Sequence, residues 1–154
     1  MALSAIPESS EYRVITILDT NVVSEPMQPV PSAAVMAWLS HKPENSHFFV
    51  TAITVAEILY GIELLPKGKR HDRLLAEAEA TFAEDFAGRI LPFDEESARA
   101  FPAIAALRRS QGRPIAELDA QIAAIARSRS AILATRNTAD FENCGVRLVN
   151  PWLA

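Results

Sequence analysis

The stretch VITILDTN, residues 14–21, decides the fold of this chain. An apolar, β-branched run ends there abruptly in an acid, a hydroxyl and an amide. Such a run, bounded by polar residues, predicts a strand buried on both faces, as in a parallel sheet. Ligands of open α/β sheets bind at the carboxyl ends of the strands, which is where Asp19 lies. Asp19 is therefore either a turn-forming acid or part of a functional site.

Strand and helix patterns alternate along the rest of the chain. Short apolar runs predict further strands at 47–50, 89–93, 131–134 and 146–149. Apolar residues at helical spacing predict helices that follow Ser32, begin at Thr51 or Thr54, and span 71–87, 95–111 and 117–128, with a proline-containing loop around 24–31. This alternation predicts an α/β fold, in which a mainly parallel sheet is covered on both faces by helices.

Length and charge limit the possible functions. The 154 residues most simply form one domain, which we place at residues 13–154 after a polar tail of residues 1–12. A net charge of −4 argues against a protein that coats DNA, because such domains are strongly basic. The tail lacks the basic start and apolar core of a signal peptide, and no apolar run reaches the length of a membrane span. We therefore expect no membrane partner.

The single cysteine, Cys144, excludes an intrachain disulfide bond. A lone cysteine suits the reducing cytosol, so we expect a cytoplasmic protein. The three histidines have no zinc-ligand spacing, and one cysteine cannot complete a zinc site. A zinc centre is therefore not expected.

Four acids are candidate site residues, although each also has an ordinary structural explanation. Glu57 lies with Ile53 and Tyr60 on one face of its predicted helix, where a carboxylate is costly to bury unless it is paired or metal-bound. The alternative for Glu57 is an edge position with a solvated carboxylate. Asp119, in the first turn of a helix, would interact favourably with the helix dipole by roughly 0.3–1 kcal/mol. Asp140, after a strand and a polar loop, could be a cap or an Asx turn.

The combination of these acids changes the interpretation. Asp19 and the loop of Asp140 follow predicted strand ends, while Glu57 and Asp119 lie on helices beside those strands, so all four can converge over one sheet edge. Clustered carboxylates repel and raise one another's pKa values unless cations neutralise them. Hard oxygen ligands select Mg²⁺ or Mn²⁺, the ions of metal-assisted phosphodiester chemistry. The four acids together therefore indicate a divalent-metal site.

Five stretches occur in a recognisable order: ILDTN at 17–21, TVAE at 54–57, LDAQIAA at 118–124, LATRNTADF at 133–141 and GVRLVNPW at 145–152. Together they resemble a PIN-domain ribonuclease, and in particular the VapC/FitB-like toxins of type II toxin–antitoxin pairs. The resemblance covers nearly the whole chain. It implies a three-layer α/β/α sandwich around a mainly parallel sheet and the activity of a Mg²⁺- or Mn²⁺-dependent endoribonuclease.

The resemblance also implies roles for particular residues. The catalytic, metal-binding acids would be Asp19, Glu57, Asp119 and Asp140, each present as the expected acid. Polar residues at supporting positions of the pattern are Thr20, Asn21, Thr135 and Asn137. We expect a metal-activated water as nucleophile, since no histidine lies near these motifs to act as a general base.

RNA must approach an acidic protein through local basic groups. Arg136 lies in the loop of Asp140, and a basic cluster precedes the helix of Asp119, consisting of Arg108, Arg109 and Arg113. We expect Arg136 and Arg113 to bind RNA phosphates, with single-stranded or looped RNA fitting best. A second group, at Lys67, Lys69, Arg70 and Arg73, is more simply a solvated face.

The resemblance implies partners as well. Toxins of this group pair with a small antitoxin that blocks the acidic site and binds operator DNA, and they commonly form homodimers. An apolar groove for an antitoxin helix could be formed by Trp38, Leu39, Leu59 and Leu64, although core packing is an alternative for these side chains.

Two other functions remain open on the sequence. A haloacid-dehalogenase-like phosphatase also places an aspartate after its first strand, but it needs a second aspartate where this chain has Asn21. A non-catalytic subunit with the same PIN fold could act only by binding an antitoxin partner. The four intact acids argue against that second alternative.

Overall fold

The computed structural model describes residues 14–41 and 46–154, so the predicted tail at 1–12 lies outside the described residues. Its sheet is parallel throughout, with the strand order β3-β2-β1-β4-β5. The strands are β1 (Val14–Leu18), β2 (Ser46–Thr51), β3 (Ile90–Leu91), β4 (Ile132–Ala134) and β5 (Arg147–Val149). The sequence-based prediction of a parallel sheet around the first strand is therefore confirmed.

Six α-helices surround the sheet in the described part of the chain. They are α1 (Thr20–Ser24), α2 (Ala33–Ser40), α3 (Ala52–Glu63), α4 (Lys69–Ala80), α5 (Glu95–Ser110) and α6 (Glu117–Ser128). Shorter helical turns are η1 (Glu25–Met27), η2 (Thr81–Asp85) and η3 (Thr138–Phe141). Ser32, Thr51 and Asp94 cap α2, α3 and α5, each with its side-chain oxygen accepting a backbone N–H three residues later, so of the two predicted starts of α3 the cap is Thr51.

Helix α1 was not predicted, because its five residues are too short to show apolar periodicity. It begins where Asp19 caps it, with Oδ1 accepting a hydrogen bond of 2.8 Å from the backbone N–H of Thr20. Its first turn therefore starts immediately after β1. This short helix turns Thr20 and Asn21 back over the end of the sheet.

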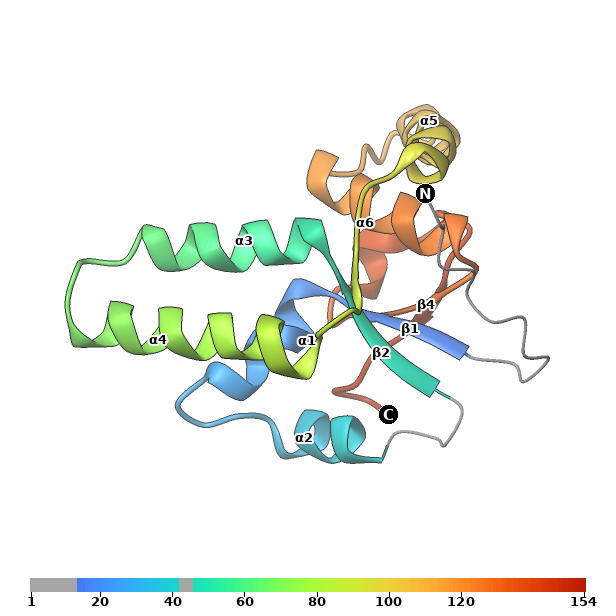
Figure 1. Ribbon diagram of the computed structural model, residues 1–154. Coiled ribbons are helices and arrows are strands. Elements are labelled where there is room, and N and C mark those ends of the chain that lie inside the picture. Colours follow the sequence, from blue (N-terminus) through green and yellow to red (C-terminus); the bar gives the residue numbers. More distant parts are fainter. Residues whose placement is uncertain (1–13, 42–45) are drawn as a thin grey trace, which may run out of the picture.

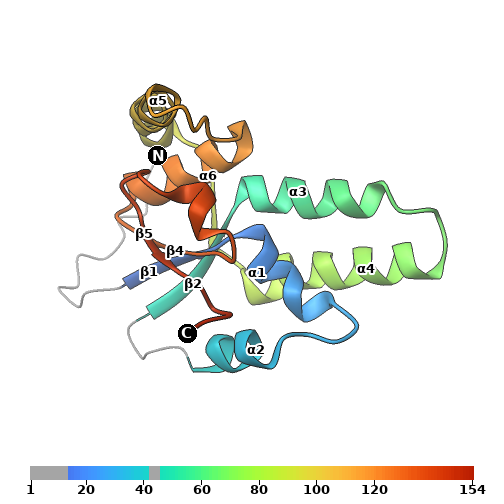
Figure 2. The ribbon, with the colours of Figure 1, turned by 180° about the vertical axis from the view of Figure 1, so that it is seen from behind.

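Two apolar cores lie on opposite faces of the sheet. Ile17 and Leu133 face a core built with α5 and α6, whereas the next residues along their strands, Leu18 and Ala134, face a core built with the helices between α1 and η2. Figures 1 and 2 show α5 and α6 on one side of the sheet and α2 on the other. The three-layer α/β/α sandwich is thus confirmed. None of the described helices is long and apolar enough to span a membrane.

Helices α3 and α4 run side by side and project away from the sheet as an arm (Figure 1). The predicted inward face of α3 was wrong. Its buried residues are Thr54, Ile58 and Ile62, which follow i, i+4 spacing, while Tyr60 is 67% exposed. The helix turns this stripe towards α1 and α4. Glu57 is half-buried beside the stripe.

The sheet changes winding direction at β1, which pairs with β2 on one side and β4 on the other. The carboxyl ends of β1 and β4 are joined where the Asp19 N–H donates to the Ala134 carbonyl at 2.9 Å. Ligands of doubly wound α/β proteins bind at such a switch point. The residues that follow β1 and β4 therefore occupy the expected place for a site.

Candidate active site

Asp19 is 5% exposed at the end of β1 and is held by three donors. Its Oδ1 accepts from the Thr20 N–H, and its Oδ2 accepts from Thr135 Oγ1 at 2.7 Å and from Asn21 Nδ2 at 3.3 Å. Burial raises the pKa of this carboxyl and the Asp140 charge raises it further, while the three hydrogen bonds lower it. The donors fix the direction in which this carboxylate faces.

Glu57 is reached from α1 by Thr20, whose Oγ1 donates to Glu57 Oε1 at 2.9 Å. Thr54 Oγ1 lies 3.0 Å from Thr20 Oγ1, and Thr51 Oγ1 donates to Thr54 Oγ1 at 3.5 Å. Since each hydroxyl has one proton, Thr54 is the donor to Thr20. A chain of three hydroxyls, of which those of Thr51 and Thr54 are fully buried, therefore directs its donors towards Glu57. Burial raises the pKa of the Glu57 carboxyl, with a further increase from Asp19, against the lowering effect of the Thr20 hydrogen bond.

Asp119 lies in the first turn of α6, as predicted. Its pKa is raised to about 6, mainly by burial and also by the charges of Asp19, Glu57 and Asp140, whereas the charge of Arg108 lowers it. A helix N-terminus would instead favour the ionised carboxylate. The net direction at Asp119 is nevertheless a raised pKa, caused by burial and the neighbouring acids.

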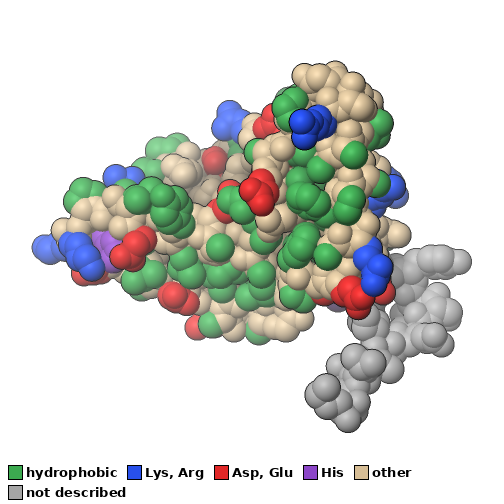
Figure 3. All heavy atoms as spheres, turned by 90° about the horizontal axis from the view of Figure 1, so that it is seen from above, with side chains coloured by type: hydrophobic (Ala, Val, Ile, Leu, Met, Phe, Trp, Pro, Cys, Tyr) green, Lys and Arg blue, Asp and Glu red, His purple; other side chains and the backbone are tan. Residues whose placement is uncertain are grey.

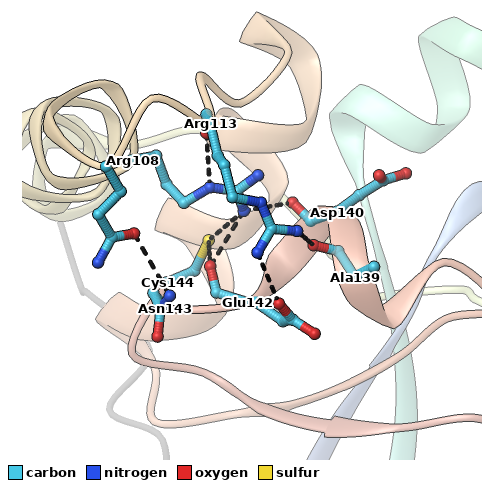
Figure 4. A network of polar contacts seen from close by, with 8 residues as sticks. Arg108, Arg113, Ala139, Asp140, Glu142, Asn143 and Cys144 are labelled. Atoms are coloured by element: carbon cyan, nitrogen blue, oxygen red, sulfur yellow. Dashed lines mark hydrogen bonds and ion pairs between the residues drawn. The ribbon is translucent and has the colours of Figure 1, made fainter.

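Asp140 lies in η3, and its backbone is held from inside by Arg108 of α5 (Figure 4). Arg108 is 5% exposed and donates from Nη1 to the carbonyls of Asp140 and Glu142 at 2.8 and 3.0 Å. Its Nε donates to the Arg113 carbonyl at 2.8 Å. The hypothesis that Arg108 holds an RNA phosphate is therefore wrong, because its guanidinium is buried among backbone carbonyls.

The two arginines expected to bind RNA differ in their surroundings. Arg113 pairs with Glu142 Oε2 at 2.9 Å and donates to the Ala139 carbonyl at 3.5 Å (Figure 4). Arg136 is exposed, and its guanidinium carbon lies 5.1 Å from the centroid of the Trp152 ring. The second basic group is exposed at the start of α4 and lies near the tip of the arm, where Figure 3 shows Lys and Arg side chains.

Three of the four supporting residues contact the acids or one another through side chains. Thr20 and Thr135 donate to carboxylates, and Asn21 Nδ2 also lies 3.4 Å from Thr135 Oγ1. Asn137 contributes its backbone N–H, which donates to Thr135 Oγ1 at 3.1 Å, and its side chain is exposed. The supporting positions therefore build one hydrogen-bonded frame around Asp19 and Glu57.

Sequence reasoning missed two parts of this frame. The hydroxyl of Thr54 was considered only as a possible helix cap, although Thr54 is completely buried beside Thr20. Arg108 was assigned to a surface cluster. Its i+4 spacing from the buried Ile104 on α5 was the one available signal that it faces inwards.

The charges of Asp19, Glu57 and Asp140 all act on the Asp119 carboxyl, so these three acids lie in its neighbourhood. Figure 3 shows acidic side chains on the face where the arm meets the body of the molecule. Within residues 14–41 and 46–154, however, no three His, Cys, Asp or Glu side chains form a ready-made metal-binding group. A carboxylate set of this kind fits Mg²⁺, which takes one or two protein carboxylates, keeps several waters and would relieve the repulsion.

Comparison with known proteins identifies the family of this arrangement. Residues 16–145 match the family model of the PIN domain. The chain belongs to the PIN-domain family. The resemblance seen in the sequence is thereby confirmed, and the haloacid-dehalogenase-like alternative loses its support.

Relatives of this PIN-domain chain include a named toxin and a named ribonuclease. The chain is 42% identical over 136 residues to Toxin FitB of Neisseria gonorrhoeae, covering 88% of this chain and 97% of that protein. It is 37% identical over 136 residues to VapC ribonuclease Y4jK of Sinorhizobium fredii, covering 88% and 96%. A solved structure of FitAB bound to an IR36 DNA fragment is similar with a TM-score of 0.82 and 42% identity, covering 89% of this chain and 95% of that chain.

Proposed function

We propose that this chain is the toxin of a type II toxin–antitoxin pair and a Mg²⁺- or Mn²⁺-dependent endoribonuclease. The observation that carries the proposal is the mutual influence of four carboxylates at the switch point of a PIN-domain sheet. The names of the relatives, a toxin and a ribonuclease, support the same activity. Carboxylates that cluster without a cationic partner can bind a divalent ion, and such an ion is what metal-assisted cleavage of phosphodiesters requires.

Each acid has a proposed role. Asp19 and Asp119 would hold the principal ion, directly or through water, and Asp140 would support that ion or a second one. When bound, a divalent ion lowers the pKa of water and stabilises negative charge on the phosphorus centre. Glu57, held in place by the Thr20 hydroxyl, would accept a hydrogen bond from the attacking water and orient it towards the phosphate. Thr135 and Asn21 would keep the Asp19 carboxylate turned towards the site.

The RNA strand would reach the acids past Arg136, with Arg113 as a second phosphate contact. Arg136 is exposed close to Asn21 and is the better placed of the two, because Arg113 already pairs with Glu142. A single strand or loop suits this site, since its backbone can bend into a recessed acidic region. We also propose a homodimer, in line with the toxins that the chain resembles.

A small DNA-binding antitoxin is the proposed partner, and operator DNA would be bound only through it. A hollow of about 630 Å³ lies between α1, α3 and α4, with Thr20 and Glu57 among its lining residues. A partner segment seated in this hollow would cover Glu57. The four residues proposed as a groove from the sequence do not provide it, because Trp38, Leu39 and Leu59 pack against the core and only Leu64 is exposed, at 66%.

The test is cleavage of single-stranded RNA by the purified, partner-free chain with Mg²⁺ or Mn²⁺, followed by analysis of the new ends. Attack by water leaves a 5′-phosphate and a 3′-hydroxyl. Neither end should form when a chelator is present. A 2′,3′-cyclic phosphate would contradict the mechanism. A folded, metal-supplied chain that cuts no RNA but binds an antitoxin would favour the alternative of a non-catalytic PIN-fold subunit.

A further inference from the structure

A second hollow, of about 640 Å³, lies next to the acidic site and differs from it in chemistry. It is lined by residues of three separate segments, including Asn21, Gln28, Val30, Arg136 and Trp152. A guanidinium, an indole, two side-chain amides and the carboxylate of Glu25, whose Oε1 accepts from the Ser32 N–H, therefore face one space. None of the proposed catalytic acids lines it.

Arg136 and Trp152 form the aromatic part of this hollow. The guanidinium carbon of Arg136 lies over the Trp152 ring, 5.1 Å from its centroid. Trp152 is half-buried and packs against the core beneath the sheet, so its ring is a fixed support. No Asp or Glu of the described residues lies within salt-bridge distance of Arg136, which leaves its charge available to a ligand.

Two asparagines hold the backbone of Arg136 and Trp152 in place. Asn150 Oδ1 accepts from the Trp152 N–H at 2.9 Å, and Asn150 Nδ2 donates to the Arg136 carbonyl at 3.4 Å. Asn21 Oδ1 accepts from the Arg136 N–H at 3.2 Å. The backbone of Arg136 is therefore fixed on both sides, so that its side chain projects from a defined position rather than from a free loop.

Asn21 also connects the hollow with the acids. Its Nδ2 donates to Asp19 Oδ2 at 3.3 Å, while its Oδ1 holds Arg136. A nucleotide held over Arg136 would therefore lie beside the Asp19 carboxylate. A phosphate contact alone would need only a flexible cation, whereas this chain supports its arginine on an aromatic ring.

We propose that Arg136, supported by Trp152, forms a subsite that binds one nucleobase of the RNA strand close to the scissile phosphate. The choice of RNA as ligand rests on the proposed function. Guanidinium planes and aromatic rings are the groups on which unpaired bases stack. The exposed amide of Gln28 is placed to accept from or donate to a base edge at the rim.

Binding to two labelled probes tests this subsite without any need for catalysis. The probes are a mixed-sequence 12-nucleotide single-stranded RNA and a ribose-phosphate chain of the same length without bases. Fluorescence anisotropy is measured in an Asp119→Asn background, which keeps the RNA intact. We expect Arg136→Lys to weaken RNA binding by about tenfold, because lysine keeps the positive charge but has no planar guanidinium on which a base can stack. Binding of the abasic chain should change less than about twofold, since phosphate contacts depend on charge.

Matched variants separate stacking from general effects. Arg99→Lys, an exposed arginine of α5 that pairs with Glu95, should leave both affinities unchanged. Trp152→Phe should keep more of the RNA affinity than Trp152→Leu, because phenylalanine retains a ring under Arg136. Equal weakening of both probes by Arg136→Lys, or no weakening of either, would overturn the subsite. Parent protein that binds both probes equally would overturn it too.

The outcome for the subsite is distinguishable from that for the nuclease. A chain that prefers base-bearing RNA through Arg136 but never cuts would keep the subsite and lose the proposed activity. A chain that cuts RNA but shows no difference between the two probes would lose the subsite alone.

Discussion

Thr20 on α1 donates a hydrogen bond of 2.9 Å from Oγ1 to Oε1 of Glu57 on α3, although the two residues are 37 positions apart. The backbone N–H of the same threonine donates to Asp19 at 2.8 Å. One residue thus sets the position of two of the four acids. Its hydroxyl is in turn held by the buried Thr54. The alignment of Glu57 therefore depends on the packing of α1 against α3.

Replacement of Thr20 by valine should impair catalysis while it preserves the fold. Valine matches the shape of threonine but cannot donate to Glu57, so the carboxylate loses its alignment and the pKa of Glu57 rises further. We expect RNA cleavage to fall about 10- to 100-fold, as for other residues that orient metal-site ligands. Thr20→Ser should retain most of the activity. Cleavage by Thr20→Val at the wild-type rate would show that this hydrogen bond has no catalytic role.

The stability of the metal-free chain should fall between about pH 4 and pH 6. Asp119 has its pKa raised from 3.8 to about 6 in the folded chain. A carboxyl whose pKa is raised by folding stabilises the folded state at pH values below its ordinary pKa. This stabilisation is lost as the pH rises through the pKa of the folded state. Thermal melts over this pH range should show the decrease in wild type and a flatter curve in Asp119→Asn. Mg²⁺ should then raise the Tm of wild type more than that of the variant. Identical pH curves would contradict the electrostatic coupling.

Arg108→Met should loosen the loop that carries Asp140. The guanidinium satisfies the carbonyls of Arg113, Asp140 and Glu142 inside the protein, and methionine leaves them without this donor. We expect a loss of about 2–3 kcal/mol in the free energy of unfolding and faster amide hydrogen exchange over residues 137–144. Arg109→Met, at an exposed position on the same helix, is the matched control. Unchanged exchange in the loop would argue against the proposed support.

Gly61→Trp should weaken antitoxin binding. Gly61 lines the hollow between α1, α3 and α4, and a side chain there meets no atom within 4 Å, so tryptophan can fill the hollow without a clash at its Cβ. Co-purification and isothermal titration with the proposed antitoxin partner should show the loss. Gly61→Ala should bind almost normally. Full affinity of Gly61→Trp would place the antitoxin elsewhere.

The parallel sheet and the helix starts were predictable because they depend on local sequence patterns. The apolar run before Asp19 required burial on both faces, which only a covered parallel sheet provides. Ser32 and Asp94 each precede a helical apolar pattern and have a side-chain oxygen, which is typical of a cap, whereas Thr51 and Thr54 remained alternatives for α3. The positions of all four acids relative to strands and helices followed from these elements.

Long-range contacts were not predictable in the same way. The predicted inward face of α3 was wrong. Tyr60 and Gly61 complete an apolar pattern in the sequence, but the helix buries Ile58 and Ile62 instead. The burial of Arg108 depends on backbone carbonyls of residues more than 30 positions away, and such partners leave no local pattern. The fold therefore followed from short stretches, whereas the details of the site required tertiary packing.

The most direct test of the central claim is cleavage of a bulk RNA pool by wild-type and Asp119→Asn protein, each freed of any partner. Both are assayed with Mg²⁺ or Mn²⁺ and then with a chelator, after circular dichroism has shown that both are folded. The four-carboxylate account predicts cutting by wild type that requires the metal and is lost in the variant. Metal-independent cutting, or equal cutting by Asp119→Asn, would contradict it.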